Sequence, residues 1–234
     1  MEIATLYTFF LNASGISTDS RKLEEGALFF ALSGPNFDGN QFAEQALKKG
    51  ALGVVIDNPN LTIKGKNVIL VENTLNTLQD LATFHRQKLG TPLIALTGSN
   101  GKTTTKELIR ALLTSKYNVL ATEGNLNNHI GVPLTLLKLK SHHEIGIIEM
   151  GANHSGEIAA LSEIAKPNWG FITNFGKAHL EGFGSMEGVI IAIIITTHMA
   201  KTAIKLPNVQ TGEGIFIVCN FGNCLLYTSD AADE

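Results

Sequence analysis

Short apolar runs and helical repeats alternate along most of the chain. In the first 90 residues, three apolar runs have the length of buried strands, and the first is followed by Gly34-Pro35, a turn signal. Apolar residues at helical spacing then end at Gly50, a residue type that commonly closes helices. We therefore predict a small α/β unit with strands at 27–33, 53–56 and 67–70 and a helix at 41–49.

A long helical repeat of leucines between residues 75 and 89 ends at Gly90-Thr91-Pro92, which marks a domain boundary. Beyond it, strands alternate with helices of about 12 residues, which predicts a parallel sheet covered on both faces, with ligands at the carboxyl ends of its strands. The fold class is therefore α/β, with domains at 1–90 and 91–189. The strands of the second domain are predicted at 93–97, 118–121, 145–149 and 169–173, and its helices at 102–113 and 156–165.

The composition changes near Val189. From Ile190 to Ser229 three residues carry a charge, whereas a typical soluble stretch of this length carries about ten. The run IIAIIITTH at 190–198 keeps neither the period of a strand nor that of a helix. One interpretation is a buried element followed by loops. The interpretation that we prefer is an out-of-frame or adapter-derived tail at 190–234, which ends in CLLYTSDAADE.

Composition and charge exclude several classes of partner. The 234 residues carry 18 Lys and Arg against 21 Asp and Glu, without the basic clusters by which proteins bind nucleic acids or anionic membranes. The longest apolar run, 189–195, is shorter than the roughly 20 residues that cross a bilayer, and the N-terminus lacks the basic start of a secretory signal. The two cysteines, in C-x4-C spacing, match neither a zinc knuckle nor a redox pair. We expect a cytoplasmic monomer that binds small molecules.

The segment TGSNGKTTT at 97–105 joins a predicted strand to a predicted helix. Gly98 and Gly101 let backbone N–H groups approach a phosphate, and the N-terminus of the helix adds partial positive charge. Lys102 can reach the outer phosphates, and the hydroxyl of Thr103 is placed for magnesium. The spacing departs from the common phosphate loop because Leu96 takes the position of the first glycine. A similar turn also occurs in proteins without a nucleotide.

Two further residues stand where a phosphate loop needs them. Glu149 ends an apolar strand and is either a second magnesium ligand or an ordinary acid at a strand end. His179 follows the strand at 169–173 and is either a metal ligand or a loop histidine. On the flanking helices, Lys106 and Arg110 are expected to face solvent, although Lys106 is close to the motif. Ser155 is expected to cap the helix at 156–165.

Four motifs follow one another along the chain: TGSNGKTTTK (97–106), EGNLNNHIGVPLTLL (123–137), EMGANHSGEI (149–158) and TNFGKAHLEGFGS (173–185). Together they resemble the Mur ligase family, and the segment at 17–39 resembles the UDP-sugar-binding domain of the same enzymes. The likeness covers about residues 14–189. It implies a small N-terminal UDP-sugar-binding α/β domain followed by an incomplete P-loop central domain with a mainly parallel sheet. The motif EMGANHSGEI resembles the version found in members that join D-alanyl-D-alanine to UDP-N-acetylmuramoyl-tripeptide. This resemblance implies an ATP-dependent amide ligase of peptidoglycan precursor synthesis that works through an acyl phosphate.

The resemblance also implies roles for individual residues, with ATP and Mg2+ as cofactors. Lys102, Glu149 and His179 would be catalytic, and Thr103, Glu149 and His179 would hold metal ions. The ATP phosphates would lie on Gly98, Ser99, Asn100, Gly101, Lys102, Thr103 and Thr104. The substrates would contact Ser20, Arg21, Asn36, Phe37, Asp38, Gly39, Asn127 and Asn128.

The chain departs from the family after residue 189. There the family has alanines and lysines, one of them carbamylated and bridging the metals, whereas this chain reads IIAIIITT. We expect the C-terminal ligase domain of the family to be absent as well, and we therefore expect a parent ligase and an inactive chain. The alternatives are a ligase similar to folylpolyglutamate synthase, against which the segment DSR and the motif EMGANHSGEI argue, and a fragment that binds without catalysis.

Overall fold

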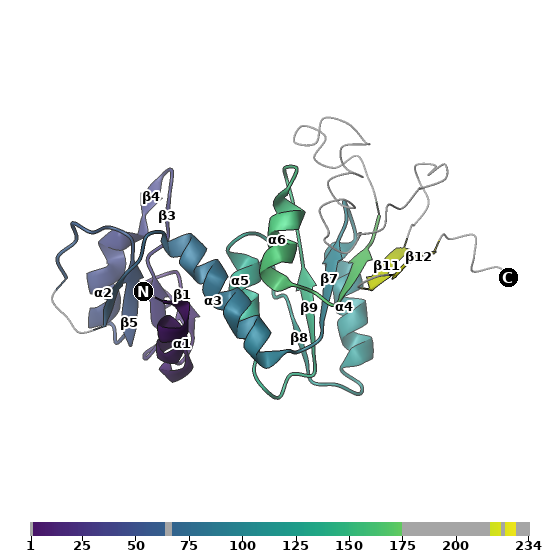
Figure 1. The fold of residues 1–234 in the computed structure, drawn as a ribbon, viewed down its shortest axis with the longest axis horizontal. Helices are drawn as coiled ribbons and strands as arrows, with labels where there is room; N and C mark the ends of the chain where they lie inside the picture. Colours follow the sequence, from purple (N-terminus) through teal and green to yellow (C-terminus); the bar gives the residue numbers. More distant parts are fainter. Residues whose placement is uncertain (1, 64–66, 175–215, 221–222, 228–234) are drawn as a thin grey trace. The chain divides into compact units, whose positions relative to one another are not determined.

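The computed structural model describes residues 2–63, 67–174, 216–220 and 223–227. They form two compact units (Figure 1). Unit 1 consists of Met1–Lys88 with Leu136–Lys138, and unit 2 consists of Leu89–Thr135 and the described residues from Leu139 onward. None of the helices among the described residues combines the length and the apolar character that crossing a bilayer requires.

Unit 1 is built on a parallel sheet whose strand order is β1-β2-β5-β6. Every residue of the two central strands is buried, as expected where both faces of a parallel sheet are covered. Phe29 and Val54 pack with alanines of α2 in the core of the unit. The elements are α1 (Ile3–Asn12), β1 (Ile16–Ser17), β2 (Leu28–Phe30), β3 (Ser33–Gly34), β4 (Phe37–Asp38), η1 (Gly39–Phe42), α2 (Ala43–Lys48), β5 (Gly53–Ile56), β6 (Val68–Leu70) and α3 (Thr74–Leu89).

The strand that forms within the apolar run at 27–33 is shorter than predicted. β2 ends at Phe30, and the chain then forms the antiparallel hairpin of β3 and β4. The hairpin turns back onto the end of β2, because the amide of Gly39 donates to the carbonyl oxygen of Leu32 at 2.9 Å. A side chain at Gly39 would overlap that carbonyl group, so this close approach requires glycine.

Unit 2 contains a sheet that is parallel from β10 to β8, which confirms the predicted fold class. Its order among the described residues is β12-β11-β10-β7-β9-β8. The strands are β7 (Leu93–Thr97), β8 (Val119–Ala121), β9 (Ile145–Glu149), β10 (Trp169–Ile172), β11 (Phe216–Asn220) and β12 (Asn223–Tyr227), and the helices are α4 (Lys102–Leu113), α5 (Gly131–Leu136) and α6 (Glu157–Ala165).

The connections of unit 2 create a switch point beside β7. From β7 the chain runs through α4 to the outer strand β8, and from β9 it runs through α6 to β10 on the other side of β7. Right-handed crossovers in opposite directions place their helices on opposite faces of the sheet, as Figure 1 shows for α4 and α6. The carboxyl ends of β7, β9 and β10 therefore lie at this switch point, where ligands typically bind in such sheets.

Of residues 190–234, the structure describes β11 and β12. They pair with each other in antiparallel fashion, and β11 continues the sheet beside β10, with Trp169 opposite Asn220. The frame-loss interpretation of this segment stays a prediction.

Candidate functional site

The turn between β7 and α4 requires glycine at two positions, for different reasons. Gly98 has a φ of 135°, and a side chain there would also overlap the hydroxyl of Thr173. Gly101 has a φ of 75° with open space around it, and it is the N-cap residue of α4. As a glycine, it offers no side chain to cap the helix. The first N–H groups of α4 are therefore the natural site for an anion.

Residues at the end of β10 hold this turn in place. The backbone N–H groups of Ser99 and Asn100 donate to the carbonyl and side-chain oxygens of Asn174, at 3.1 and 3.0 Å. The hydroxyl of Thr173 donates in turn to the carbonyl oxygen of Asn100 at 2.6 Å. Asn174 was not among the residues that the sequence singled out, although it follows a predicted strand, a position where polar residues often serve a site. The turn is thus fixed between two neighbouring strands.

Lys102, the first residue of α4, lies folded back over the turn. Its Nζ donates to the carbonyl oxygen of Gly98 at 2.6 Å. Burial lowers the pKa of Lys102, and the negative charge of Glu149 opposes this shift. The half-buried ammonium group therefore lies within the turn, close to where the outer phosphates of a bound nucleotide would lie.

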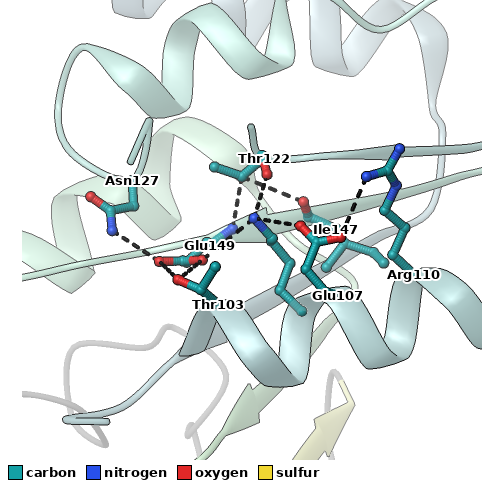
Figure 2. A network of polar contacts seen from close by, with 8 residues as sticks. Thr103, Glu107, Arg110, Thr122, Asn127, Ile147 and Glu149 are labelled. Atoms are coloured by element: carbon teal, nitrogen blue, oxygen red, sulfur yellow. Dashed lines mark hydrogen bonds and ion pairs between the residues drawn. The ribbon is translucent and has the colours of Figure 1, made fainter. Parts of the chain in front are cut away.

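Thr103 and Glu149 meet at the carboxyl end of the sheet, as Figure 2 shows. The hydroxyl of Thr103 lies 3.2 and 3.4 Å from the two carboxylate oxygens of Glu149. Glu149 is 2% exposed, and the side-chain amide of Asn127 donates to its Oε1 at 3.0 Å. Three residues predicted as site residues are thus brought together from α4, β9 and the loop after β8.

This pair suits a magnesium ion. Mg2+ prefers oxygen ligands, and it commonly uses one or two carboxylates together with substrate phosphates and water. Adjacent ligands of an octahedral Mg2+ lie about 2.9 Å apart, close to the separation of the Thr103 hydroxyl and Glu149 Oε2. Among the described residues no group of three or more His, Cys, Asp or Glu side chains is arranged to hold a metal without such help.

Lys106 is buried, which corrects the expectation that it faces solvent. Its side chain is 1% exposed, and its Nζ donates to the carbonyl oxygen of Thr122 at 2.6 Å. Nζ also lies 3.1 Å from Oε1 of Glu107 and 3.8 Å from Oε2 of Glu149. Hydrogen bonding to Lys106 is the main cause that lowers the pKa of Glu107. Arg110, one turn further along the helix, is exposed as predicted.

Of two other predicted residues in the loops, Asn128 caps a helix and Ser155 does not. The side-chain oxygen of Asn128 accepts hydrogen bonds from the backbone of Ile130 and Gly131, at 3.1 and 2.9 Å, and so caps the start of α5. The expectation that Ser155 caps α6 is wrong, because the N-cap residue is Gly156 in a left-handed conformation. The carboxylate of Glu157 instead accepts from the backbone N–H groups of Asn153 and His154.

The residues expected to contact a UDP-sugar lie in unit 1. Ser20 is buried, and Arg21 is exposed and paired with Asp19 through two side-chain hydrogen bonds. The ring of Phe37 is 56% exposed and lies over Gly34. Asn36 is exposed at the hairpin turn, while Asp38 and Gly39 are held by the hairpin itself. His179 lies outside the described residues.

A buried polar network supports this hairpin. The amide of Asn40, which is 4% exposed, donates to Asp38 and Asp57, both at 2.8 Å. Asp57 also accepts hydrogen bonds from the backbone N–H and hydroxyl of Thr74 at the start of α3. Burial raises the pKa of Asp57, but these hydrogen bonds outweigh it and the net shift is downward. The sequence did not reveal the network, because its members are scattered between residues 38 and 74.

Comparison with known proteins agrees with the resemblance read from the sequence. The model of the Mur ligase catalytic domain family matches residues 12–86, and that of the Mur ligase middle domain matches residues 96–211, so together they cover most of the chain. A curated relative is the UDP-N-acetylmuramoyl-tripeptide--D-alanyl-D-alanine ligase of Bacillus subtilis, 49% identical over 87% of this chain. The chain spans 42% of the length of that relative.

Two solved structures share the fold. The MurF crystal structure from Acinetobacter baumannii matches 97% of this chain and 60% of its own, with a TM-score of 0.74 and 28% identity. The MurF ligase of Thermotoga maritima, in complex with ADP, matches 94% of this chain and 58% of its own, with a TM-score of 0.71 and 28% identity. With both family models, a close curated relative and these structures in agreement, the chain belongs to the Mur ligase family.

Proposed function

We propose that the protein is an ATP-dependent amide ligase that joins D-alanyl-D-alanine to UDP-N-acetylmuramoyl-tripeptide. The observation that carries the proposal is the meeting of the glycine-rich turn, Lys102, Thr103 and Glu149 at the carboxyl ends of β7 and β9. The identity of the B. subtilis relative supports the choice of substrates, since that relative is named for this reaction. The domains at 1–90 and 91–189 are part of the same proposal.

The turn and the start of α4 would bind the ATP phosphates. Backbone N–H groups at a helix N-terminus favour negative charge, and Lys102 would turn from the carbonyl oxygen of Gly98 toward the outer phosphates. Thr103 and Glu149 would hold Mg2+, which when bound neutralises phosphate charge and orients the γ-phosphate. Burial of Glu149 and its hydrogen bond from Asn127 fix the carboxylate in advance of binding.

The chemistry would proceed in two balanced steps. A carboxylate oxygen of the tripeptide attacks the γ-phosphorus of ATP, so that ADP leaves and an acyl phosphate forms. The amine of D-alanyl-D-alanine then attacks the acyl carbon, phosphate leaves and the amine loses a proton. Because phosphoryl transfer depends mainly on alignment and charge neutralisation, residues of the kinds found here are sufficient for the first step.

We further propose that unit 1 binds the UDP-sugar through Ser20, Arg21 and the hairpin residues 36–39. The exposed ring of Phe37 and the exposed guanidinium group of Arg21 supply an aromatic face and a positive charge, which suit a nucleobase and a diphosphate. The polar network around Asn40 keeps the hairpin rigid enough to present these groups. A second metal bound through His179 remains part of the proposal.

The experiment that tests the function is a ligation assay of a full-length form of the enzyme with the three substrates. Phosphate release and the mass of the nucleotide product are followed with ATP, UDP-N-acetylmuramoyl-tripeptide and D-alanyl-D-alanine, and with each omitted in turn. We expect product to require all three. Phosphate release that requires a folate and glutamate in place of the muramyl nucleotide and dipeptide would contradict the proposal. The same assay on the 234-residue chain tests the expectation that this chain is inactive.

A further inference from the structure

Lys106 carries a positive charge into the interior of unit 2. Its side chain is 1% exposed, and the mechanism outlined above makes no use of it. A buried charge is costly unless it is paired and hydrogen-bonded. We therefore expect the contacts of this lysine to offset the free-energy cost of burying its charge.

The contacts of Lys106 join three elements of the sheet. The residue itself lies in the second turn of α4, and its Nζ donates to the carbonyl oxygen of Thr122, directly after β8. The same atom lies 3.8 Å from Oε2 of Glu149 at the end of β9. Glu107 holds the ammonium group from the solvent side, at 3.1 Å.

These three elements are the ones that supply the candidate cation site. α4 carries Thr103, β9 carries Glu149, and the loop after β8 carries Asn127. Thr122 adds a second link, because its hydroxyl accepts a hydrogen bond from the backbone N–H of Glu149 at 2.9 Å. Figure 2 shows how Thr122, Glu149, Asn127 and Thr103 converge. The lysine is therefore placed to fix the positions of the cation ligands relative to one another.

We propose that Lys106 is a positioning residue for the nucleotide-associated cation. Its ammonium group, anchored on the Thr122 carbonyl oxygen, holds the Glu149 carboxylate in the orientation in which it faces Thr103. The inference rests on the proposed function, because it takes a divalent cation at Thr103 and Glu149 as given. Lys106 itself touches neither the cation nor the nucleotide.

The direction in which metal affinity changes when Lys106 is replaced distinguishes a positioning role from a purely electrostatic one. A cation close to Glu149 repels a second cation, so removing the charge of Lys106 would by itself tighten metal binding. Loss of positioning has the opposite effect, since removing a partner that orients a metal ligand typically costs about 10- to 100-fold in metal affinity. Lys106→Met tests the two directions directly, because it removes the ammonium group and leaves a long apolar side chain.

The test is calorimetric titration of the 234-residue chain with ADP, in excess Mg2+ and again in EDTA. We expect Lys106→Met to weaken ADP binding about tenfold or more in Mg2+ and to leave it unchanged in EDTA. In a chain that already carries Glu149→Gln, Lys106→Met is expected to cause no further loss, because it acts through Glu149. Lys116→Met, which removes an exposed lysine just beyond α4, is the matched control and should bind as the unmodified chain does.

Each contrary outcome has a distinct meaning. Equal weakening of ADP binding in Mg2+ and in EDTA would show a general structural role and overturn the inference. Tighter ADP binding in Mg2+, or losses that add to those of Glu149→Gln, would also overturn it. If melting curves show that Lys106→Met does not fold, Lys106→Gln takes its place with the same expected pattern, because its amide retains a donor for Thr122. An unmodified chain that binds no ADP would instead contradict the proposed function.

Discussion

Replacing Gly98 by alanine is expected to destabilise unit 2 strongly. The backbone at this position has a φ of 135°, where a non-glycine residue costs about 1–3 kcal/mol. The added methyl group would also overlap the hydroxyl of Thr173 and lie 3.1 Å from backbone atoms of Asn174, and overpacking of this kind costs about 1–3 kcal/mol. We therefore expect the free energy of unfolding to fall by about 2–6 kcal/mol, a sum of the two contributions.

Gly101→Ala is the matched control for this substitution. Its φ of 75° is also positive, but the added methyl group would meet no atom of a non-neighbouring residue within 4 Å, so only the backbone cost of about 1–2 kcal/mol applies. Urea unfolding followed by the fluorescence of Trp169, the single tryptophan and a residue of β10, reports on unit 2 for both variants. Equal losses for the two variants, or a loss below about 1 kcal/mol for Gly98→Ala, would refute the packing of the turn against β10.

Three further predictions concern the candidate site and unit 1. Thr103→Val should weaken ADP binding in Mg2+ about tenfold but not in EDTA, whereas Thr114→Val, at the other end of α4, should change neither; calorimetry measures both. Lys102→Ala should slow ATP-dependent ligation by about 10²-fold or more in phosphate-release assays of a form that ligates, and near-normal turnover would count against its role. Asp57 has a net lowered pKa, so the stability that it contributes is present above about pH 4 and is lost as the pH falls through its folded pKa. Asp57→Asn should therefore show a shallower loss of thermal stability between about pH 5 and 2 than the unmodified chain. Equal losses in the two proteins would show that Asp57 does not cause this pH dependence.

Much of the sheet in unit 2 was predictable from the sequence. The runs LIALT and IGIIE are apolar up to their last residue because both faces of a parallel strand are covered, and the structure has strands with these bounds. The helix from Lys102 to Leu113 was predicted with its observed bounds, since a glycine precedes it and apolar residues recur at helical spacing. Local patterns were sufficient here because each strand or helix is long and uninterrupted.

Other features depend on contacts between distant residues. The run ALFFALS has the pattern of one strand, but the close approach of Gly39 to Leu32 ends β2 early and begins a hairpin. The short helix α5, capped by Asn128, was not predicted because six residues show too little periodicity. Such elements are fixed by side-chain hydrogen bonds that spacing does not reveal.

Only part of the candidate site was predictable, because some of its contacts also join distant residues. Lys102 and Thr103 follow from the order of strand, glycine-rich turn and helix, and Glu149 follows from its position at the end of an apolar strand. Both are local signals. The burial of Lys106 could not be read from the sequence, because its acceptor is the carbonyl oxygen of Thr122, 16 residues away. Asn174 was missed because its role lies in two hydrogen bonds from the turn at Ser99 and Asn100.

The proposed function requires that this chain hold an adenine nucleotide at the turn before α4 and a muramyl nucleotide on unit 1. Titration of the 234-residue chain with ADP and Mg2+, and separately with UDP-N-acetylmuramoyl-tripeptide, measures both directly. We expect each ligand to bind, with ADP binding weakened by Lys102→Ala and muramyl-nucleotide binding unaffected by it. A folded chain that binds neither ligand, or whose ADP binding ignores both Mg2+ and Lys102, would contradict the account.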